Sequence, residues 1–172
     1  PANEEGLKYM VRAIEGAGYS TEEMGIALDV AATEFYQDGK YHMDTKAISS
    51  EELANIYSGW LDDYPILSIE DGFAEDDWRG WTDFTKAEGN RVQIVGDDLF
   101  VTQAERLAQG IEMKAANAML VKVNQVGTVT ETLESMDLAS SNGFNNVISH
   151  RSGETEDVTI ADLAVGTRAG QI

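Results

Sequence analysis

The chain has no cysteine among its 172 residues, and this absence removes two kinds of site. Without thiols, neither a disulfide framework nor a thiolate-bound metal is available. Any metal ion would have to take oxygen ligands, which suits a hard cation such as Mg²⁺. A metal site in this protein would therefore be built from carboxylate and carbonyl oxygens.

Long apolar runs and basic residues are also scarce. No apolar stretch approaches the roughly 18 residues of a membrane span, and Pro1–Leu7 lacks the basic and apolar regions of a signal peptide. Only 12 Lys and Arg stand against 31 Asp and Glu, which gives a formal net charge of −19. Such a surface repels phosphate backbones. We therefore expect no nucleic-acid partner and no membrane span, with most of the acidity serving solubility.

Five short apolar runs each stop at a charged or polar residue. The runs are Ile26–Asp29, Ile66–Asp71, Val92–Asp98, Met119–Asn124 and Val147–Arg151. The residues that break them are Asp29, Glu70, Asp97, Lys122 and His150. From the second run onward, these residues stand about one strand plus one helix apart. The pattern is typical of strands that alternate with helices.

This alternation predicts an α/β fold with a parallel sheet. A closed eight-unit barrel usually needs about 250 residues, so the length predicts a partial TIM-like (β/α) barrel of about five parallel strands. Side chains at the carboxyl ends of successive parallel strands converge on one mouth, where such barrels keep their active sites. We therefore expect the five run-ending residues to share a rim and to form a metal-assisted proton-transfer site.

Helices and one hairpin are predicted between the runs. A stripe of apolar residues predicts a helix from Asn3 to the Gly16–Gly18 region, and aromatic residues around Asp38-Gly39 predict a hairpin in Glu34–His42. Capping boxes predict three further helix starts, namely Ser49 with Glu52, Thr102 with Glu105 and Thr128 with Glu131. The remaining predicted helices are Trp78–Glu88 and Thr159–Thr167.

Asp29, Glu70 and Asp97 are the candidate metal ligands. Three carboxylates on neighbouring strand ends can fix Mg²⁺ while leaving positions for water and substrate oxygens. The alternative is that each carboxylate caps the helix that follows it, as acidic residues at such junctions often do. After Asp97 this alternative is weaker, because Thr102 is predicted to cap the next helix.

Lys122 and the segment Ser149–Asp157 offer the other chemical groups. Directed into the barrel mouth near a metal, Lys122 could serve as a general base, and a salt bridge to a neighbouring carboxylate is the equal alternative. Arg151 offers a planar fork for phosphate, with the Ser152 hydroxyl beside it. Alone, this segment would be an ordinary polar loop. Its place after the fifth run favours a binding role.

Several strings closely resemble enolases, and together they cover nearly the whole chain. They are Ala27–Asp29, Ser68–Gly72, Ala74–Trp78, Val95–Leu99, Leu120–Gln125 and Ser149–Asp157. The last two are highly specific to enolases. Gly72 in place of proline resembles bacterial members, and Gln103, where many relatives carry Asn, is a minor departure.

The resemblance implies a phosphopyruvate hydratase, a lyase of glycolysis that dehydrates 2-phosphoglycerate to phosphoenolpyruvate with two Mg²⁺ ions. It implies that Asp29, Glu70 and Asp97 hold the metal ion. Members of the family form homo-oligomers in the cytoplasm. Some are also found at cell surfaces or outside the cell, and members of the family bind host or ribonuclease partners.

The same resemblance implies roles for the remaining candidates. Lys122 would remove the proton next to the substrate carboxylate, and it would contact the substrate in doing so. Arg151 and Ser152 would bind the phosphate of this small phosphorylated acid. His150 would be a further substrate contact. The phosphate pair argues against a superfamily dehydratase or racemase that acts on unphosphorylated acids.

The chain departs from the family in what it lacks. Residues 1–172 would be a middle-to-late portion of the C-terminal barrel domain, without the N-terminal domain, the Glu general acid or the remaining strands. The start at Pro1 suggests processing or excision. Because one lost proton-transfer group costs about 10²–10⁴-fold, we expect the chain alone to have little or no dehydratase activity. The alternative is a non-catalytic fragment that acts as a binding or surface antigenic module.

Overall fold

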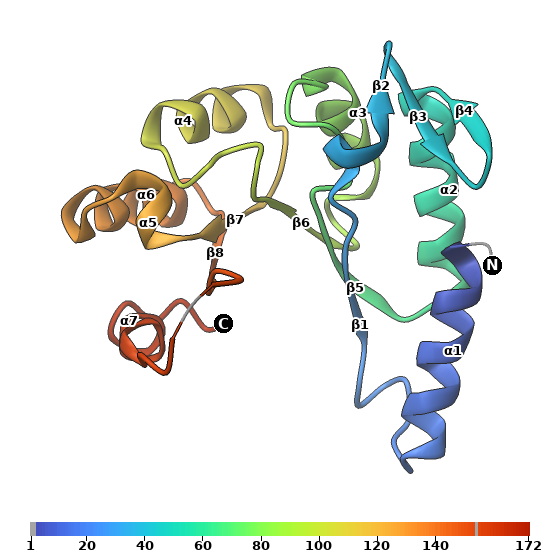
Figure 1. Cartoon of the computed structure of the whole chain (residues 1–172), viewed down its shortest axis with the longest axis horizontal. Coiled ribbons are helices and arrows are strands. Elements are labelled where there is room, and N and C mark those ends of the chain that lie inside the picture. The colour runs from blue at the N-terminus through green and yellow to red at the C-terminus, as the bar shows by residue number, and fades with distance from the viewer. Residues whose placement is uncertain (1–2, 154) are drawn as a thin grey trace. The chain divides into compact units, whose positions relative to one another are not determined.

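A computed structural model describes residues 3–153 and 155–172, so Glu154 of the predicted polar loop lies outside the described residues. The chain divides into two compact units, residues 1–93 and 94–172. Five parallel strands alternate with helices along the chain (Figure 1). The predicted α/β class is confirmed, and the alternation is consistent with part of a TIM barrel.

The sheet strands follow the order β1, β5, β6, β7, β8. They are β1 (Ile26–Asp29), β5 (Ile66–Glu70), β6 (Gln93–Gly96), β7 (Ala118–Val121) and β8 (Asn145–Ile148). The helices are α1 (Asn3–Gly16), α2 (Ser50–Asp63), α3 (Trp78–Glu88), α4 (Ala104–Met113), α5 (Val123–Val126), α6 (Val129–Ser141) and α7 (Thr159–Gly166). Three of the five predicted runs thus correspond closely to strands. Strand β7 ends before the run Met119–Asn124 does, and β8 begins two residues before the run Val147–Arg151 and ends at Ile148.

The first unit is organised around a cluster of buried aromatic rings. They come from a hairpin strand, from α2, from α3 and from the loop between β5 and α3, and neighbouring rings lie between 5.6 and 6.1 Å apart. The rings are Tyr41, Tyr57, Phe73, Trp81 and Phe84. Edge-to-face packing of this kind stabilises a core beyond the area it buries. The cluster holds β3, α2 and α3 together around the loop that follows β5.

A small antiparallel sheet follows the 3₁₀ helix η1 (Ala32–Phe35) in the first unit. Its strands are β2 (Tyr36–Gln37), β3 (Lys40–Met43) and β4 (Lys46–Ile48). The predicted hairpin around Asp38-Gly39 is confirmed, and β4 adds a third strand that the sequence pattern did not indicate. The Tyr41 hydroxyl donates to Asp77 Oδ2 at 2.7 Å and accepts from the Ala74 N–H at 2.9 Å. These bonds attach the small sheet to the start of α3.

The second unit carries strands packed on both faces. All four residues of β7 are buried, and β7 pairs in register with β8 from Ala118 opposite Asn145 to Val121 opposite Ile148. Val95, Ala118 and Leu120 form a buried apolar cluster. Consecutive apolar residues are expected where both faces of a parallel strand are covered. This packing fixes the ends of β6 and β7, after which the polar candidates begin.

Two predicted boundaries in the second unit are wrong. Strand β7 stops at Val121, and Val123–Val126 forms the short helix α5, which ends at Gly127 with a φ of +100°. Thr102 does not cap α4, because Gln103 occupies the N-cap position and makes no side-chain cap hydrogen bond. The capping box at Ser49 and the N-cap at Thr128 are confirmed.

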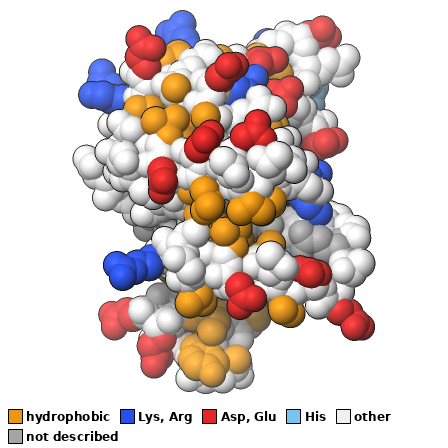
Figure 2. All heavy atoms as spheres, turned by 90° about the vertical axis from the view of Figure 1, so that its left-hand side faces the viewer, with side chains coloured by type: hydrophobic (Ala, Val, Ile, Leu, Met, Phe, Trp, Pro, Cys, Tyr) orange, Lys and Arg blue, Asp and Glu red, His pale blue; other side chains and the backbone are white. Residues whose placement is uncertain are grey.

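The surface is acidic with apolar side chains among the charges. Figure 2 shows acidic side chains spread over one face, interspersed with exposed apolar ones. Exposed apolar residues of the second unit include Val129, Val158 and Val165. Within the described residues, no helix combines the length and the apolar character that crossing a bilayer requires.

Candidate functional site

In the first unit, Asp29 and Glu70 lie at the carboxyl ends of adjacent parallel strands. The two residues are register partners in the β1–β5 ladder, and the Val30 N–H donates to the Glu70 carbonyl at 2.9 Å. The Asp29 residue is exposed and Glu70 is half-buried. A cavity of about 530 Å³ lies beside Asp29, lined by residues of α1 and β1 together with Trp60. The structure therefore brings two of the three predicted metal ligands together at one sheet edge.

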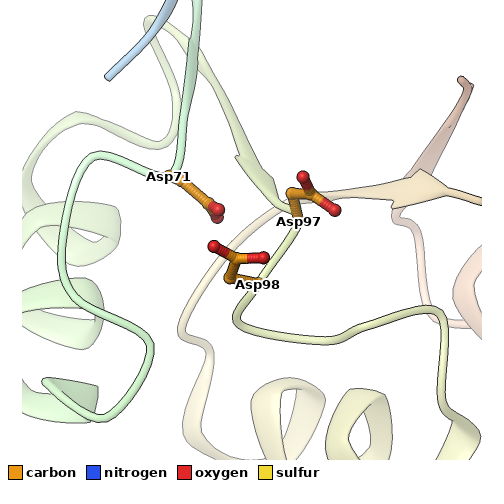
Figure 3. A group of neighbouring side chains, drawn as sticks. All are labelled: Asp71, Asp97 and Asp98. Atoms are coloured by element: carbon orange, nitrogen blue, oxygen red, sulfur yellow. The ribbon is translucent and has the colours of Figure 1, made fainter. Parts of the chain in front are cut away.

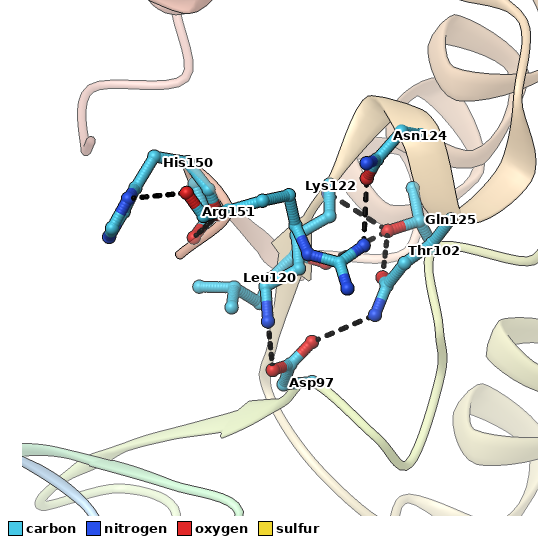
Figure 4. A network of polar contacts seen from close by, with 9 residues as sticks. Asp97, Thr102, Leu120, Lys122, Asn124, Gln125, His150 and Arg151 are labelled. Carbon is cyan, nitrogen blue, oxygen red and sulfur yellow. Dashed lines mark hydrogen bonds and ion pairs between the residues drawn. The ribbon is translucent and has the colours of Figure 1, made fainter. Parts of the chain in front are cut away.

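In the second unit, Asp97 and Lys122 form an ion pair. Asp97 follows β6 and Lys122 follows β7, and Lys122 Nζ contacts Asp97 Oδ2 (Figure 4). Their side chains are only 12% and 17% exposed, so solvent screens the pair weakly. The predicted salt bridge of Lys122 to a neighbouring carboxylate is confirmed, and the pair lies just after the ends of β6 and β7.

Three aspartates offer oxygen ligands of the kind that hard cations prefer. Asp71 follows β5 in the first unit, and Asp97 and Asp98 follow β6 in the second (Figure 3). Ligand oxygens of Asp97 and Asp98 lie within 4.8 Å of one another. Because the donors are carboxylates, they fit Mg²⁺ or a similar ion better than a soft transition metal. The sequence analysis did not single out Asp71 or Asp98 as metal ligands.

Thr102 and Gln125 connect the ion pair to the backbone, and sequence reasoning missed both roles. The Lys122 N–H donates to Thr102 Oγ1 at 2.9 Å, and this hydroxyl donates to Gln125 Oε1 at 2.9 Å. The Gln125 amide then donates to Asp97 Oδ1 at 3.3 Å (Figure 4). The only sequence signal for Gln125 was its position in the string Leu120–Gln125.

The loop before Thr102 is strained. Val101 and Thr102 have φ values of +44° and +56°, a region that β-branched residues rarely adopt. Each such residue costs on the order of 1–3 kcal/mol, and it persists only where the surroundings over-determine it. Val101 is held by its N–H, which donates to the Asp97 carbonyl at 2.8 Å. In this backbone conformation, the buried Thr102 hydroxyl donates to Gln125 of α5.

The candidate phosphate-binding residues follow β8. The Nη1 atom of Arg151 donates to Asn124 Oδ1 at 2.8 Å, so the guanidinium is held beside α5 (Figure 4). His150 and Ser152 are exposed, and His150 Nδ1 lies 3.2 Å from the Arg151 carbonyl oxygen. Because Asn124 and Gln125 are adjacent on α5, this short helix holds Arg151 on one side and Asp97 on the other.

The fold and these side chains together define a class of protein. An α/β sheet that carries carboxylates and a lysine at its strand ends is typical of domains that perform proton transfer with a metal ion. The chain matches the family described as Enolase, C-terminal TIM barrel domain, over residues 1–172. It belongs to that family, and the resemblance inferred from the sequence strings is confirmed at this level.

Proposed function

We propose that this chain carries the metal-binding and base-bearing part of a phosphopyruvate hydratase, which dehydrates 2-phosphoglycerate to phosphoenolpyruvate. The observation that carries the proposal is the Lys122–Asp97 pair, which stands at two strand ends in a member of the enolase C-terminal domain family. The reaction needs a base next to bound positive charge, because the proton to be removed is very weakly acidic. The cellular setting that accompanies this proposal is cytoplasmic glycolysis in a homo-oligomeric enzyme.

Asp29, Glu70 and Asp97 are the proposed Mg²⁺ ligands. Support comes from the register of Asp29 opposite Glu70, from the position of Asp97 after β6, and from the oxygen-only donor set. When bound, Mg²⁺ supplies positive charge against the negative charge that develops on the substrate carboxylate. Asp71 and Asp98 supply further carboxylate oxygens beside these ligands in the sequence.

Lys122 is the proposed base. Its Nζ, as the free amine, would take the proton from the carbon next to the substrate carboxylate. The electron pair of that C–H bond would move onto the carboxylate, where bound positive charge stabilises it. The ion pair with Asp97 holds Nζ at the strand end.

Arg151, Ser152 and His150 are the proposed substrate-binding residues. A guanidinium presents parallel N–H donors that match a phosphate. The contact from Asn124 restrains the Arg151 side chain before the substrate arrives, which lowers the cost of ordering it. Ser152 adds a hydroxyl in the same exposed loop.

The base role can be tested by hydrogen exchange, which needs only the base and the metal ion. The chain is incubated in D₂O with 2-phosphoglycerate and Mg²⁺, and mass spectrometry follows the uptake of one deuterium at the carbon next to the carboxylate. Exchange should occur and should fall by about 10²–10⁴-fold in Lys122→Ala.

Lys86→Ala is the matched control, since it removes an exposed lysine from α3. This variant should exchange like the unaltered chain. Absence of exchange in the unaltered chain, or full exchange in Lys122→Ala, would contradict the proposal.

A further inference from the structure

The Asp97–Lys122 ion pair is part of a closed ring of hydrogen bonds (Figure 4). Starting at the Lys122 backbone, it passes through the Thr102 hydroxyl and the Gln125 amide to Asp97 Oδ1. It returns from Asp97 Oδ2 to Nζ of the same lysine. Both carboxylate oxygens of Asp97 therefore have a defined donor, and both ends of Lys122 are held.

The Asp97 carboxylate decides the orientation of the Gln125 amide, because a carboxylate only accepts hydrogen bonds. The Thr102 hydroxyl accepts from the Lys122 N–H, and its single proton faces two acceptors, Gln125 Oε1 at 2.9 Å and the Leu120 carbonyl at 3.4 Å. This leaves the NH₂ group of Gln125 for the Asp97 carboxylate. A flipped amide would place its oxygen against the carboxylate and lose the hydrogen bond to Asp97.

The backbone at Thr102 and in α5 holds these hydrogen-bonding groups in place. Thr102 is fully buried, and it adopts a positive φ although it is β-branched. Gln125 belongs to α5, whose first turn is closed by the bond from the Gln125 N–H to the Lys122 carbonyl at 2.9 Å. The same short helix therefore fixes the residue after β7 and the amide that reaches Asp97.

We propose that Thr102 and Gln125 are positioning residues for the metal ligand Asp97 and the base Lys122. Neither would touch substrate or metal. Gln125 sets the plane of the Asp97 carboxylate through Oδ1, and Thr102 fixes the amide of Gln125 together with the backbone of Lys122. Partners of this kind orient metal ligands, and their loss weakens metal binding by about 10–100-fold. The inference rests on the proposed function, because it assigns Asp97 to the metal ion.

Magnesium titration of the full chain by calorimetry tests the positioning of Asp97. Gln125→Met keeps the length of the side chain and removes the amide, and it should weaken Mg²⁺ binding by about tenfold or more. Gln109→Met makes the same change at an exposed position of α4 and should bind Mg²⁺ like the unaltered chain. Equal Mg²⁺ affinity in Gln125→Met and the unaltered chain would overturn the role of Gln125.

A pair of variants at position 102 separates the hydroxyl from the shape of the side chain. Thr102→Val keeps the branched shape without the hydroxyl and should weaken Mg²⁺ binding in the same direction as Gln125→Met. Thr102→Ser keeps the hydroxyl and should restore the affinity. If Thr102→Ser and Thr102→Val bind Mg²⁺ equally well, the hydroxyl has no positioning role. Circular dichroism of each variant confirms that it is folded.

A metal-free measurement separates this inference from the proposed function. In a chain labelled with ¹³C at lysine Cε, NMR relaxation reports the order of the Lys122 side chain without Mg²⁺. That order should fall in Gln125→Met and stay unchanged in Gln109→Met. If the unaltered chain fails to bind Mg²⁺, the proposed function fails, whereas an unchanged Lys122 order in Gln125→Met overturns the positioning role by itself.

Discussion

At the scale of single residues, Tyr57 shows how burial decides the chemistry of a side chain. It is fully buried in the aromatic cluster, and its hydroxyl donates to the Gly72 carbonyl at 2.9 Å. Burial raises the pKa of Tyr57 well above its usual value, because the phenolate would lose its hydration. Tyr41 behaves in the same way: burial first, and then Asp77, raise its pKa.

This shift predicts a loss of stability in alkali. Below the ordinary tyrosine pKa of about 10, the contribution of Tyr57 is fully present. Above it the unfolded chain releases a proton that the folded chain keeps, so the free energy of unfolding should fall by up to about 1.4 kcal/mol per pH unit for each such tyrosine. Urea unfolding between about pH 9 and pH 11 measures the slope.

Tyr57→Phe is the variant that isolates this effect. It should lower stability at neutral pH by about 1–3 kcal/mol, because the Gly72 carbonyl loses its donor, and it should flatten the alkaline slope. An alkaline slope equal to that of the unaltered chain would show that Tyr57 does not control it.

The residues of the candidate site were partly predictable from the sequence. Asp97 and Lys122 were predicted because functional side chains of such folds lie at the carboxyl ends of parallel strands. The structure places the two side chains in contact. Thr102 was assigned to the wrong partner, because the spacing to Glu105 matches a capping box. Only the neighbouring strand could reveal that its hydroxyl faces Gln125 and the Lys122 N–H.

At the scale of elements, the helix α4 packs closely against Phe100 at a glycine, Gly110. Gly110 is buried, and a Cβ added there would lie 2.3 Å from Cε1 of Phe100, which is itself fully buried. Gly6 in α1 has nothing within 4 Å of the same position. The two glycines therefore differ in packing and share the same helical backbone.

The contrast predicts opposite effects of alanine. Gly110→Ala should lower stability by about 1–3 kcal/mol, because the ring of Phe100 cannot yield without disturbing the core. Gly6→Ala should raise stability by about 0.5–1 kcal/mol, because alanine favours the helix and meets no neighbour. Urea unfolding of both variants provides the comparison. A Gly110→Ala variant as stable as Gly6→Ala would contradict the packing argument.

The elements themselves were largely predictable, with errors where apolar residues continue past a boundary. The run Met119–Asn124 was interpreted as strand throughout, although β7 stops at Val121. Val123 and Val126 are apolar whether they lie in a strand or in α5, so periodicity over so few residues cannot distinguish the two states. The hydrogen bond of the Lys122 N–H to Thr102, which leaves the ladder, marks the boundary.

At the scale of the whole molecule, the net charge of −19 is the dominant property. Self-repulsion of such a charge destabilises a compact chain, and salt screens it over about 30 Å at 0.01 M and about 10 Å at 0.1 M. The melting temperature should therefore rise by several degrees between these salt concentrations. Differential scanning calorimetry in NaCl checks this, with sucrose of equal osmolality as the control. A melting temperature that falls or stays constant would contradict the prediction.

The sequence alone determined the class of fold, the family and the hard, oxygen-rich nature of any metal site. These follow from local facts, namely the spacing of apolar residues, the absence of thiols and the strings that resemble enolases. The tertiary structure decided where β7 ends, which residue holds Asp97 and what the Thr102 hydroxyl meets. The physical reason is that a hydrogen bond depends on which groups from different strands come within about 3 Å, and local periodicity does not record that distance.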